Sequence, residues 1–263
     1  MIEVHLVALC FKGFPMLRWI TNKENVLNEF FIKDASVYFS GVYADTLLKG
    51  VNPKDYQCWH YWGKSSSACF IGGKRLRGAD PKTFRVLNYA YAIDETSIYT
   101  SSGRIVDAHL STFQVLDSGQ NHVGAPQGYA KDCRNVYFHN GDGKVKCVRN
   151  ADPSSFYSLG DTFFARDKQR VYAYGKPLTK VDLSSWELLS HWYSRDAKRV
   201  YYLNREIKGA DKDSFKVYTP LDASPFADHL ARDQKHFFWN DEITDEAQWF
   251  EQFHQMDFEQ STR

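Results

Sequence analysis

The chain has 263 residues, of which 43% are hydrophobic and 25% charged, a composition that excludes disorder and allows a sizeable core. Its 33 Lys and Arg residues against 32 Asp and Glu residues leave a formal charge of +1, which argues against a dedicated binder of nucleic acid or anionic lipid. No stretch approaches the roughly 18 apolar residues that a membrane-spanning helix needs. Aromatic residues make up 16% of the chain, so some recurring element must use them.

The first 28 residues come before the main pattern, and we expect them to form an N-terminal cap of strand or helix. The run from Met1 to Cys10 contains Glu3 and His5 and has no basic start, which indicates a mature strand rather than a secretory leader. Five cysteines without a CxxC pair indicate reduced thiols. We therefore expect a cytoplasmic protein.

From residue 29 to residue 240 one pattern recurs with a period of about 30 residues. It runs aromatic, any residue, basic, Asp, three residues, Val-Tyr, a polar turn, an aliphatic residue, Ala/Val-Asp-x-x-Ser-aromatic, and a closing aliphatic pair. About seven copies align on their first aspartate, with Ser65 in the place of one of them: Asp34, Ser65, Asp94, Asp132, Asp167, Asp196 and Asp233.

The residue pattern of each copy predicts a strand, a turn, a second strand, a second turn, a third strand and one helical turn. Apolar residues alternate around Tyr193, and β-branched and aromatic residues dominate around Val200, as in short strands. Aspartate suits the first turn because its carboxylate accepts hydrogen bonds from backbone N–H groups two residues on. The Ala-Asp-Pro segment from Ala79 predicts an N-cap and a helical turn. The aromatic residue that ends this turn should plug the core: Phe84, Phe156, Trp186 and Phe215.

Because an isolated hairpin is only marginally stable, the copies must stack on one another. We predict a mainly β fold, in which about seven β-hairpin plus short-helix repeats form a solenoid-like or curled sheet with a C-terminal helix. Residues 29–240 would be a single domain. A propeller blade has four strands and about 40 to 45 residues, so the shorter copies favour an open solenoid, with a closed ring of seven as the alternative.

Residues 241–263 predict an acidic amphipathic helix, with Trp249, Phe253 and Met256 at helical spacing and Thr244 as its N-cap. It would cap the last copy, as repeat proteins require, or present an acidic surface to a partner. The candidate partner-binding residues are Asp241, Glu242, Asp245, Glu246, Trp249 and Glu251.

No residue set predicts catalysis. Cys58, His60 and Cys69 could outline a zinc site, but both cysteines align with apolar positions of other copies, which predicts core residues. One carboxylate per turn is too few for Ca²⁺, and HExxH, GxSxG, Walker and GxGxxG motifs are absent from the sequence. His109 stands where other copies have Asp. We expect no enzyme, catalytic residue, metal or cofactor; a hydrolase with a scattered carboxylate pair is the remaining enzymatic alternative.

The repeat resembles the DKNYY family of bacterial repeat proteins, named for an Asp-Lys-Asn-Tyr-Tyr core, over about residues 29–240. The matching segments begin at Asp132, Asp167 and Asp196 and run to the Val-Tyr pair. Ser65 and His109 depart from the pattern, so we expect those two copies to be distorted. The resemblance implies a non-enzymatic scaffold, and some members of the family look like immunity partners of polymorphic toxins.

On this resemblance we expect a protein-binding scaffold, an immunity protein that neutralises a cognate toxin by covering its active site. We expect a monomer in the free state, with no nucleic-acid or membrane partner. The alternative is a glycan-binding or envelope-associated module, because one member of each Val-Tyr pair should face outward or toward the next copy. The insertions 117–127 and 219–228 are further places where binding could be grafted onto the scaffold.

Overall fold

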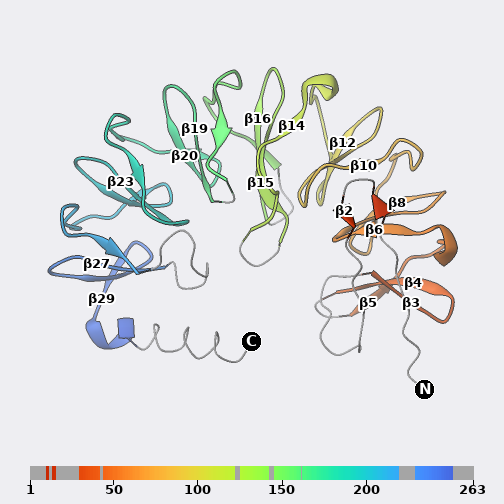
Figure 1. Ribbon diagram of the computed structural model, residues 1–263, viewed down its shortest axis with the longest axis horizontal. Helices are drawn as coiled ribbons and strands as arrows, with labels where there is room; N and C mark the ends of the chain where they lie inside the picture. Colours follow the sequence, from red (N-terminus) through yellow and green to blue (C-terminus); the bar gives the residue numbers. More distant parts are fainter. Residues whose placement is uncertain are drawn as a thin grey trace. The chain divides into compact units, whose positions relative to one another are not determined.

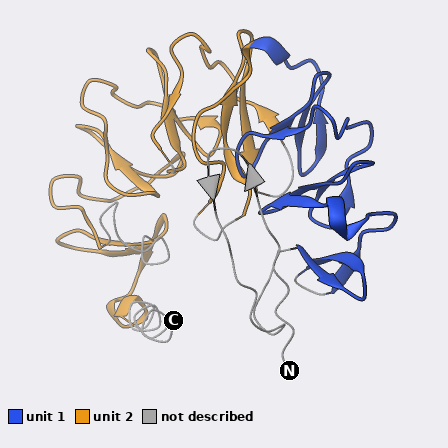
Figure 2. Cartoon of the chain, turned by 45° about the vertical axis from the view of Figure 1, so that its right-hand side comes forward, with its two compact units in different colours: residues 1–111 blue, residues 112–263 orange. Residues whose placement is uncertain are grey.

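A computed structural model describes residues 10–11, 14–15, 30–41, 44–121, 125–141, 145–160, 162–218 and 229–250. They belong to two compact units, Met1–Ser111 and Thr112–Arg263, shown in blue and orange in Figure 2. The predicted array of residues 29–240 therefore contributes to both units. From the predicted N-terminal cap the structure describes the short antiparallel pair of β1 (Cys10–Phe11) and β2 (Phe14–Pro15); the rest of residues 1–28 lies outside the described residues.

Unit 1 contains three further antiparallel sheets. The first has the strands β3 (Phe30–Lys33), β4 (Ser36–Ser40) and β5 (Asp45–Leu47), and the 3₁₀ helix η1 (Pro53–Asp55) follows it. The second has β6 (Gln57–Trp59), β7 (Trp62–Lys64), β8 (Cys69–Ile71) and β9 (Lys74–Arg75). The third has β10 (Arg85–Val86), β11 (Ala92–Ile93), β12 (Ile98–Thr100) and β13 (Gly103–Ile105). A second 3₁₀ helix, η2 (Leu110–Thr112), follows.

Unit 2 contains four sheets of four strands each (Figure 1). Their strands are β14 (Gln114–Val115), β15 (Gln127–Lys131), β16 (Val136–Asn140) and β17 (Val145–Cys147); β18 (Tyr157–Ser158), β19 (Phe164–Arg166), β20 (Val171–Ala173) and β21 (Lys176–Pro177); β22 (Glu187–Leu188), β23 (Tyr193–Arg195), β24 (Val200–Tyr202) and β25 (Arg205–Glu206); and β26 (Lys216–Val217), β27 (Leu230–Arg232), β28 (Phe237–Trp239) and β29 (Glu242–Thr244). In every sheet the strands pair antiparallel in chain order.

The predicted mainly β array of about seven repeats is confirmed, but the prediction of three strands per copy is wrong. The residues directly after the plug aromatic form a further short strand, as where Glu187 and Leu188 pair with Arg195 and Ser194. Two residues are too few to show the period of a strand, so the pattern did not reveal it. Four such short strands fit into a repeat of about 30 residues. A repeat of this length can therefore have the four-stranded order of a propeller blade, which the sequence analysis considered too long for it.

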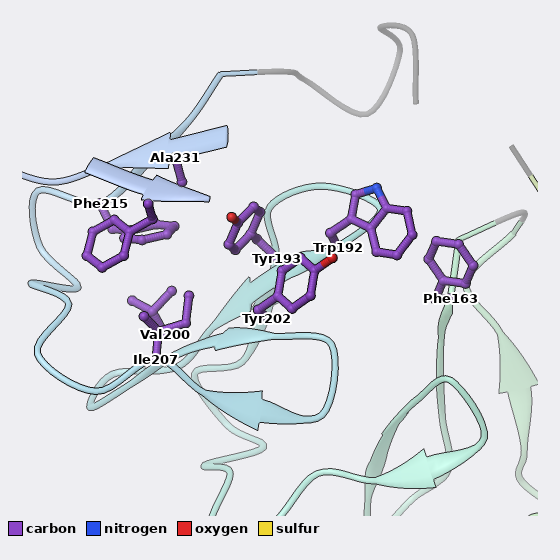
Figure 3. Close-up of a cluster of buried hydrophobic side chains, with 9 residues drawn as sticks. Phe163, Trp192, Tyr193, Val200, Tyr202, Ile207, Phe215 and Ala231 are labelled. Carbon is purple, nitrogen blue, oxygen red and sulfur yellow. The ribbon is translucent and has the colours of Figure 1, made fainter. Parts of the chain in front are cut away.

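The core lies between consecutive sheets rather than within one sheet. On β24, Val200 and Tyr202 face the next sheet and join a cluster with its Phe215 (Figure 3). Tyr201, between them, joins Val171 of the preceding sheet in another cluster. Successive side chains point to opposite faces of a strand, so a strand that is covered on both faces must be apolar at every position. This explains the buried Val-Tyr pairs and confirms that the copies stack.

The recurrent turn aspartate is buried and accepts four hydrogen bonds. Asp167 Oδ1 accepts from the backbone N–H groups of Gln169 (2.8 Å) and Arg170 (2.7 Å). Asp167 Oδ2 accepts from the hydroxyl of Tyr172 (2.7 Å) and the backbone N–H of Asp152 (3.0 Å). Asp94 and Asp196 make the corresponding contacts. The predicted turn role is confirmed, and the Asp-to-Tyr spacing of five residues follows from this bond.

The helical turn is clamped onto the aspartate turn at two points. Asp152 caps it, since its Oδ1 accepts from the backbone N–H of Ser154 (3.0 Å) and its own N–H reaches Asp167. Ser155 Oγ then accepts from the backbone N–H of Lys168 (3.3 Å). Phe156, which ends the turn, is 2% exposed and packs in the core between two sheets. The predicted cap and plug are therefore confirmed in this copy; Phe84 and Phe215 are buried plugs too, whereas Trp186 is only partly buried.

We expect the fold to lose stability in acid. Burial alone would raise the pKa of Asp167, but hydrogen bonds from Asp152, Tyr172 and the turn backbone outweigh it and lower that pKa. A carboxylate whose pKa is lower in the folded than in the unfolded state contributes stability above the unfolded value, near pH 3.9, and loses it as the pH falls through the folded value. The thermal midpoint should be flat down to about pH 5 and fall steeply below about pH 4. A midpoint that stays constant to about pH 3 would contradict this role for the aspartates.

Two copies depart from this turn, at Ser65 and Asp34, and a third departs from the cap of the helical turn, at His109. Ser65 is buried and its Oγ accepts from the backbone N–H of Ser67 (3.2 Å), so it replaces part of the aspartate network. His109 Nδ1 lies 3.5 Å from Ser111 Oγ, beside η2. Both copies still form four-stranded sheets, so the distortion expected there is not seen. Asp34 is the real exception, because it is exposed in a two-residue turn with Ala35, both at positive φ.

The two cysteines considered for zinc are core residues, as predicted. Cys58 is 6% exposed and packs in the cluster between the first two main sheets of unit 1, whereas Cys69 is fully buried in the next cluster. Burial raises the pKa of the Cys69 thiol to about 12, which keeps it protonated. Within the described ranges, His, Cys, Asp and Glu side chains form no group of three or more that could hold a metal ion. No helix among those same residues is long and apolar enough to cross a membrane.

Candidate functional site

The last sheet of unit 2 and the residues after it hold most of the predicted partner-binding residues. β28 and β29 form the final hairpin, and residues 246–250 continue from it as a helix. Five exposed residues of this hairpin and helix are called the terminal edge: Trp239, Glu242, Ile243, Glu246 and Phe250.

Exposed large apolar side chains are frequent at the terminal edge, on both faces of the last sheet: Ile243 pairs with Phe238 and shares its face, whereas Trp239 lies on the other face. Trp239, Ile243 and Phe250 are 41%, 53% and 42% exposed. Among the described residues the other large exposed apolar side chains are Leu47, Val106 and Tyr157, one in each of three other repeats. A short segment of the last repeat thus holds as many exposed apolar side chains as all the other described repeats together, so single scattered residues do not explain the terminal edge.

The predicted acidic residues have different roles in the structure. Asp241 forms an ion pair with Arg205 (2.8 Å), which ties the final hairpin to β25. Glu242 and Glu246 are exposed. Asp245 Oδ1 accepts from the backbone N–H of Gln248 (2.8 Å), so Asp245 is the N-cap. The structure therefore brings two exposed carboxylates, Glu242 and Glu246, to the terminal edge.

Two details of the predicted helix are wrong. It begins after Asp245 rather than at residue 241, because Glu242–Thr244 pairs with β28 as a strand. Thr244 is paired with Phe237 in this sheet, so it cannot be the cap. Glu251, Phe253 and Met256 lie outside the described residues.

Trp249 is an interior residue. It is 2% exposed, and its ring lies 4.5 Å from that of Tyr218 and 5.3 Å from that of Phe237. It follows its capping Asp245 by four residues, as Phe215 follows Asp211 in the helical turn before. The start of the C-terminal helix is therefore another copy of the helical turn, and Trp249 is its core plug rather than a surface contact.

The sequence analysis missed Trp239, Ile243 and Phe250. Phe237 and Trp239 lie on the face of β28 that points away from the preceding sheet, because Phe238 between them is fully buried in the shared cluster. In an interior repeat that face is covered by the next sheet. The last copy keeps the apolar residues of the pattern, so its own sequence does not distinguish this face from a covered one.

Both predicted insertions occupy the connection between the first and second strands of a sheet. Residues 117–127 lie between β14 and β15, and 219–228 lie between β26 and β27. In the first, Asp117 accepts hydrogen bonds from the backbone N–H groups of Gly119 (3.0 Å) and Tyr129 (2.7 Å), which fasten the loop to the sheet. Residues 122–124 and 219–228 lie outside the described residues.

The tyrosines of the Val-Tyr pairs do not form an exposed platform. Four of them are at most 2% exposed: Tyr99, Tyr137, Tyr172 and Tyr201. Tyr99, Tyr172 and Tyr201 pack against the preceding sheet of their own unit, whereas Tyr38 is only partly buried and stacks on Phe31. Stacking of sugars on these four tyrosines would require the repeats to separate. A glycan-binding role would have to use other residues.

Comparison with known proteins identifies the family of this repeat. The model of the DKNYY family matches residues 61–205, more than half of the chain. The chain belongs to the DKNYY family. No curated protein and no solved structure matches it. In this DKNYY chain the aspartate and tyrosine of the family's core have a structural explanation, since Asp167 and Tyr172 are hydrogen-bonded partners inside one turn.

Proposed function

We propose that this DKNYY-family chain is a non-enzymatic repeat scaffold that binds another protein through its terminal edge. Trp239 and Glu242, which are cross-strand partners on the outward face of the last sheet, and Phe250, whose ring lies 6.3 Å from that of Phe237 on the same face, support the proposal. Protein interfaces combine apolar anchors, which lose their water on binding, with charged residues at the rim that select the partner. The consensus residues are used in turns and cores, which leaves binding to residues outside the consensus.

We further propose that the partner is a cognate toxin and that the chain is its immunity protein. An acidic edge with apolar anchors suits a basic active site, which it would cover, and complementary charge would speed the association. The family resemblance, in which some members look like immunity partners of toxins, motivates the choice of partner. Free cysteines at Cys133 and Cys147, both exposed, are compatible with action in the reducing cytoplasm.

Capture from a native host extract, with mass spectrometry and titration of the retained protein, tests the proposal. We expect the variant Trp239→Ala/Ile243→Ala/Phe250→Ala to bind at least about 100-fold more weakly, because each exposed anchor contributes about 1 to 2 kcal/mol. The matched control Leu47→Ala/Val106→Ala/Tyr157→Ala removes three equally exposed apolar side chains from other repeats. Its affinity should stay within about threefold of the parent chain.

The outcomes distinguish the proposal of a protein-binding scaffold from the proposal of an immunity protein. Equal binding by the parent chain and the terminal-edge variant would rule out the terminal edge as the contact. A captured partner that stays active with one equivalent of this chain would leave the scaffold in place and overturn the immunity role. Retention of wall or capsule polysaccharide without protein would instead favour the glycan-binding alternative.

A further inference from the structure

Exposed basic side chains recur at the fourth strands of unit 2. In three consecutive sheets, one basic residue on the fourth strand is followed by a second one shortly after the strand ends. All six are exposed, and we call them the basic edge: Lys146, Arg149, Lys176, Lys180, Arg205 and Lys208. The second main sheet of unit 1 has the same pattern at Lys74 and Arg77.

The sheets are held so that these strands lie on the same side of the stack. The hydroxyl of Tyr174, which directly follows β20, donates to the carbonyl oxygen of Asn140, the last residue of β16 (2.8 Å), so the turns before the fourth strands of these two sheets lie together. Shared clusters join each of the three sheets to the next. Sheets packed face to face lie about 10 Å apart, so the basic edge places a pair of cations at about that interval.

Protection of sheet edges explains only part of the basic edge. Charged residues on edge strands, lysine above all, prevent unwanted strand pairing, which accounts for Lys146, Lys176 and Arg205. Within residues 145–150, 176–181 and 205–210 the only acidic residue is Glu206, which lies 3.5 Å from Arg199 in an ion pair. Moreover, Arg149, Lys180 and Lys208 follow the strands rather than lie on them. Edge protection therefore does not account for these three residues.

The formal charge of +1 conceals this edge. Many carboxylates of unit 2 lie in turns between second and third strands, where backbone N–H groups compensate their charge locally: Asp132, Asp167, Asp196 and Asp233. The formal net charge counts these buried carboxylates together with the exposed basic residues, although they do not neutralise the exposed surface. The expectation of no nucleic-acid partner, which came from that sum, does not apply to a local surface.

We propose that the basic edge binds the phosphodiester backbone of nucleic acid without reading its bases. The three segments carry no large exposed apolar side chain among the described residues, so they lack the anchors that a protein interface uses. A line of cations is sufficient for a phosphate chain, because release of counterions drives that association. Sequence would not be read, because exposed aromatic side chains for stacking bases are absent from those segments. Arg205 contributes less than the others because Asp241 already pairs with it.

Fluorescence anisotropy with a labelled oligothymidine of about 20 nucleotides tests this, between about 50 and 200 mM salt. We expect Lys146→Gln/Lys176→Gln/Lys208→Gln to bind at least about tenfold more weakly at the lowest salt, and the slope of log K against log salt to fall by about 2. The control Lys168→Gln/Lys198→Gln/Lys235→Gln removes the same charge from exposed residues of three consecutive aspartate turns. It should keep most of the affinity.

Three results would overturn the proposal. The first is no binding by the parent chain at about 50 mM salt. The second is an equal loss in both triple variants, which would mean that net charge alone matters. The third is binding of polyglutamate as tight as that of oligothymidine, which would indicate an acidic protein as the partner. If the edge variant melts early, the single variants replace it, each with a slope lower by about 0.7.

Discussion

Replacement of Asp167 by alanine is expected to lower the free energy of unfolding by about 3 to 5 kcal/mol. The side chain is 1% exposed and accepts four hydrogen bonds. Its loss leaves three backbone N–H groups without their acceptor, whereas the Tyr172 hydroxyl can still donate to the carbonyl oxygen of Asn150 (2.9 Å). Asp167→Asn should lie between the parent chain and alanine, because it keeps an acceptor oxygen but loses the charge.

Urea unfolding followed by circular dichroism measures this effect. The matched control is Asp213→Ala, because Asp213 is 80% exposed and pairs only at the surface with Lys212. Its effect should stay within about 0.5 kcal/mol. If the free energy of unfolding of Asp167→Ala also stayed within about 1 kcal/mol of that of the parent chain, the aspartate turn would not stabilise the repeat as its hydrogen bonds indicate.

Gly63→Ala is expected to destabilise the chain by about 3 kcal/mol through overpacking. A Cβ atom at Gly63 would lie 1.9 Å from the Tyr56 hydroxyl oxygen and 2.6 Å from its Cζ atom. Tyr56 is the plug of the helical turn before this sheet, and its hydroxyl is buried without a hydrogen-bond partner among the described residues. Other repeats combine phenylalanine with alanine at these two positions: Phe84 with Ala92, Phe156 with Ala165, and Phe215 with Ala231.

The double variant Tyr56→Phe/Gly63→Ala recreates the combination of those repeats. We expect its free energy of unfolding to return to within about 1 kcal/mol of the parent chain, with Tyr56→Phe alone neutral or stabilising because it removes an unsatisfied buried hydroxyl. Urea midpoints of the four chains complete the double-mutant cycle. Additive effects of the two substitutions would show that Tyr56 and Gly63 do not share one packing site.

The recurrence made most of the fold predictable. Aspartate before Val-Tyr, and Asp-x-x-Ser before an aromatic residue, have few local solutions besides a turn and a capped helical turn, and Asp167, Asp152 and Phe156 adopt them. The first strand of each sheet was missed because pairs such as Glu187–Leu188 are too short for a periodic signal. Their pairing is decided by the neighbouring strand, not by their own residues.

The candidate site was predictable only in part. Its acidic character could be read from the sequence, and Glu242 and Glu246 are exposed as expected. Trp249 was misplaced because helical spacing alone does not distinguish a core plug from a surface anchor; the distance from its capping Asp245 does. Trp239 was missed because its exposure depends on which sheet is last, which local sequence does not encode.

Hydrogen–deuterium exchange of the chain, alone and with its captured partner protein, tests the central claim most directly. The account predicts that binding slows exchange at residues 237–250, in the final hairpin and the helical turn around Trp249, and leaves the aspartate turns of the other repeats unchanged. Slowed exchange elsewhere, with none at residues 237–250, would contradict the assignment of the terminal edge as the partner-binding surface.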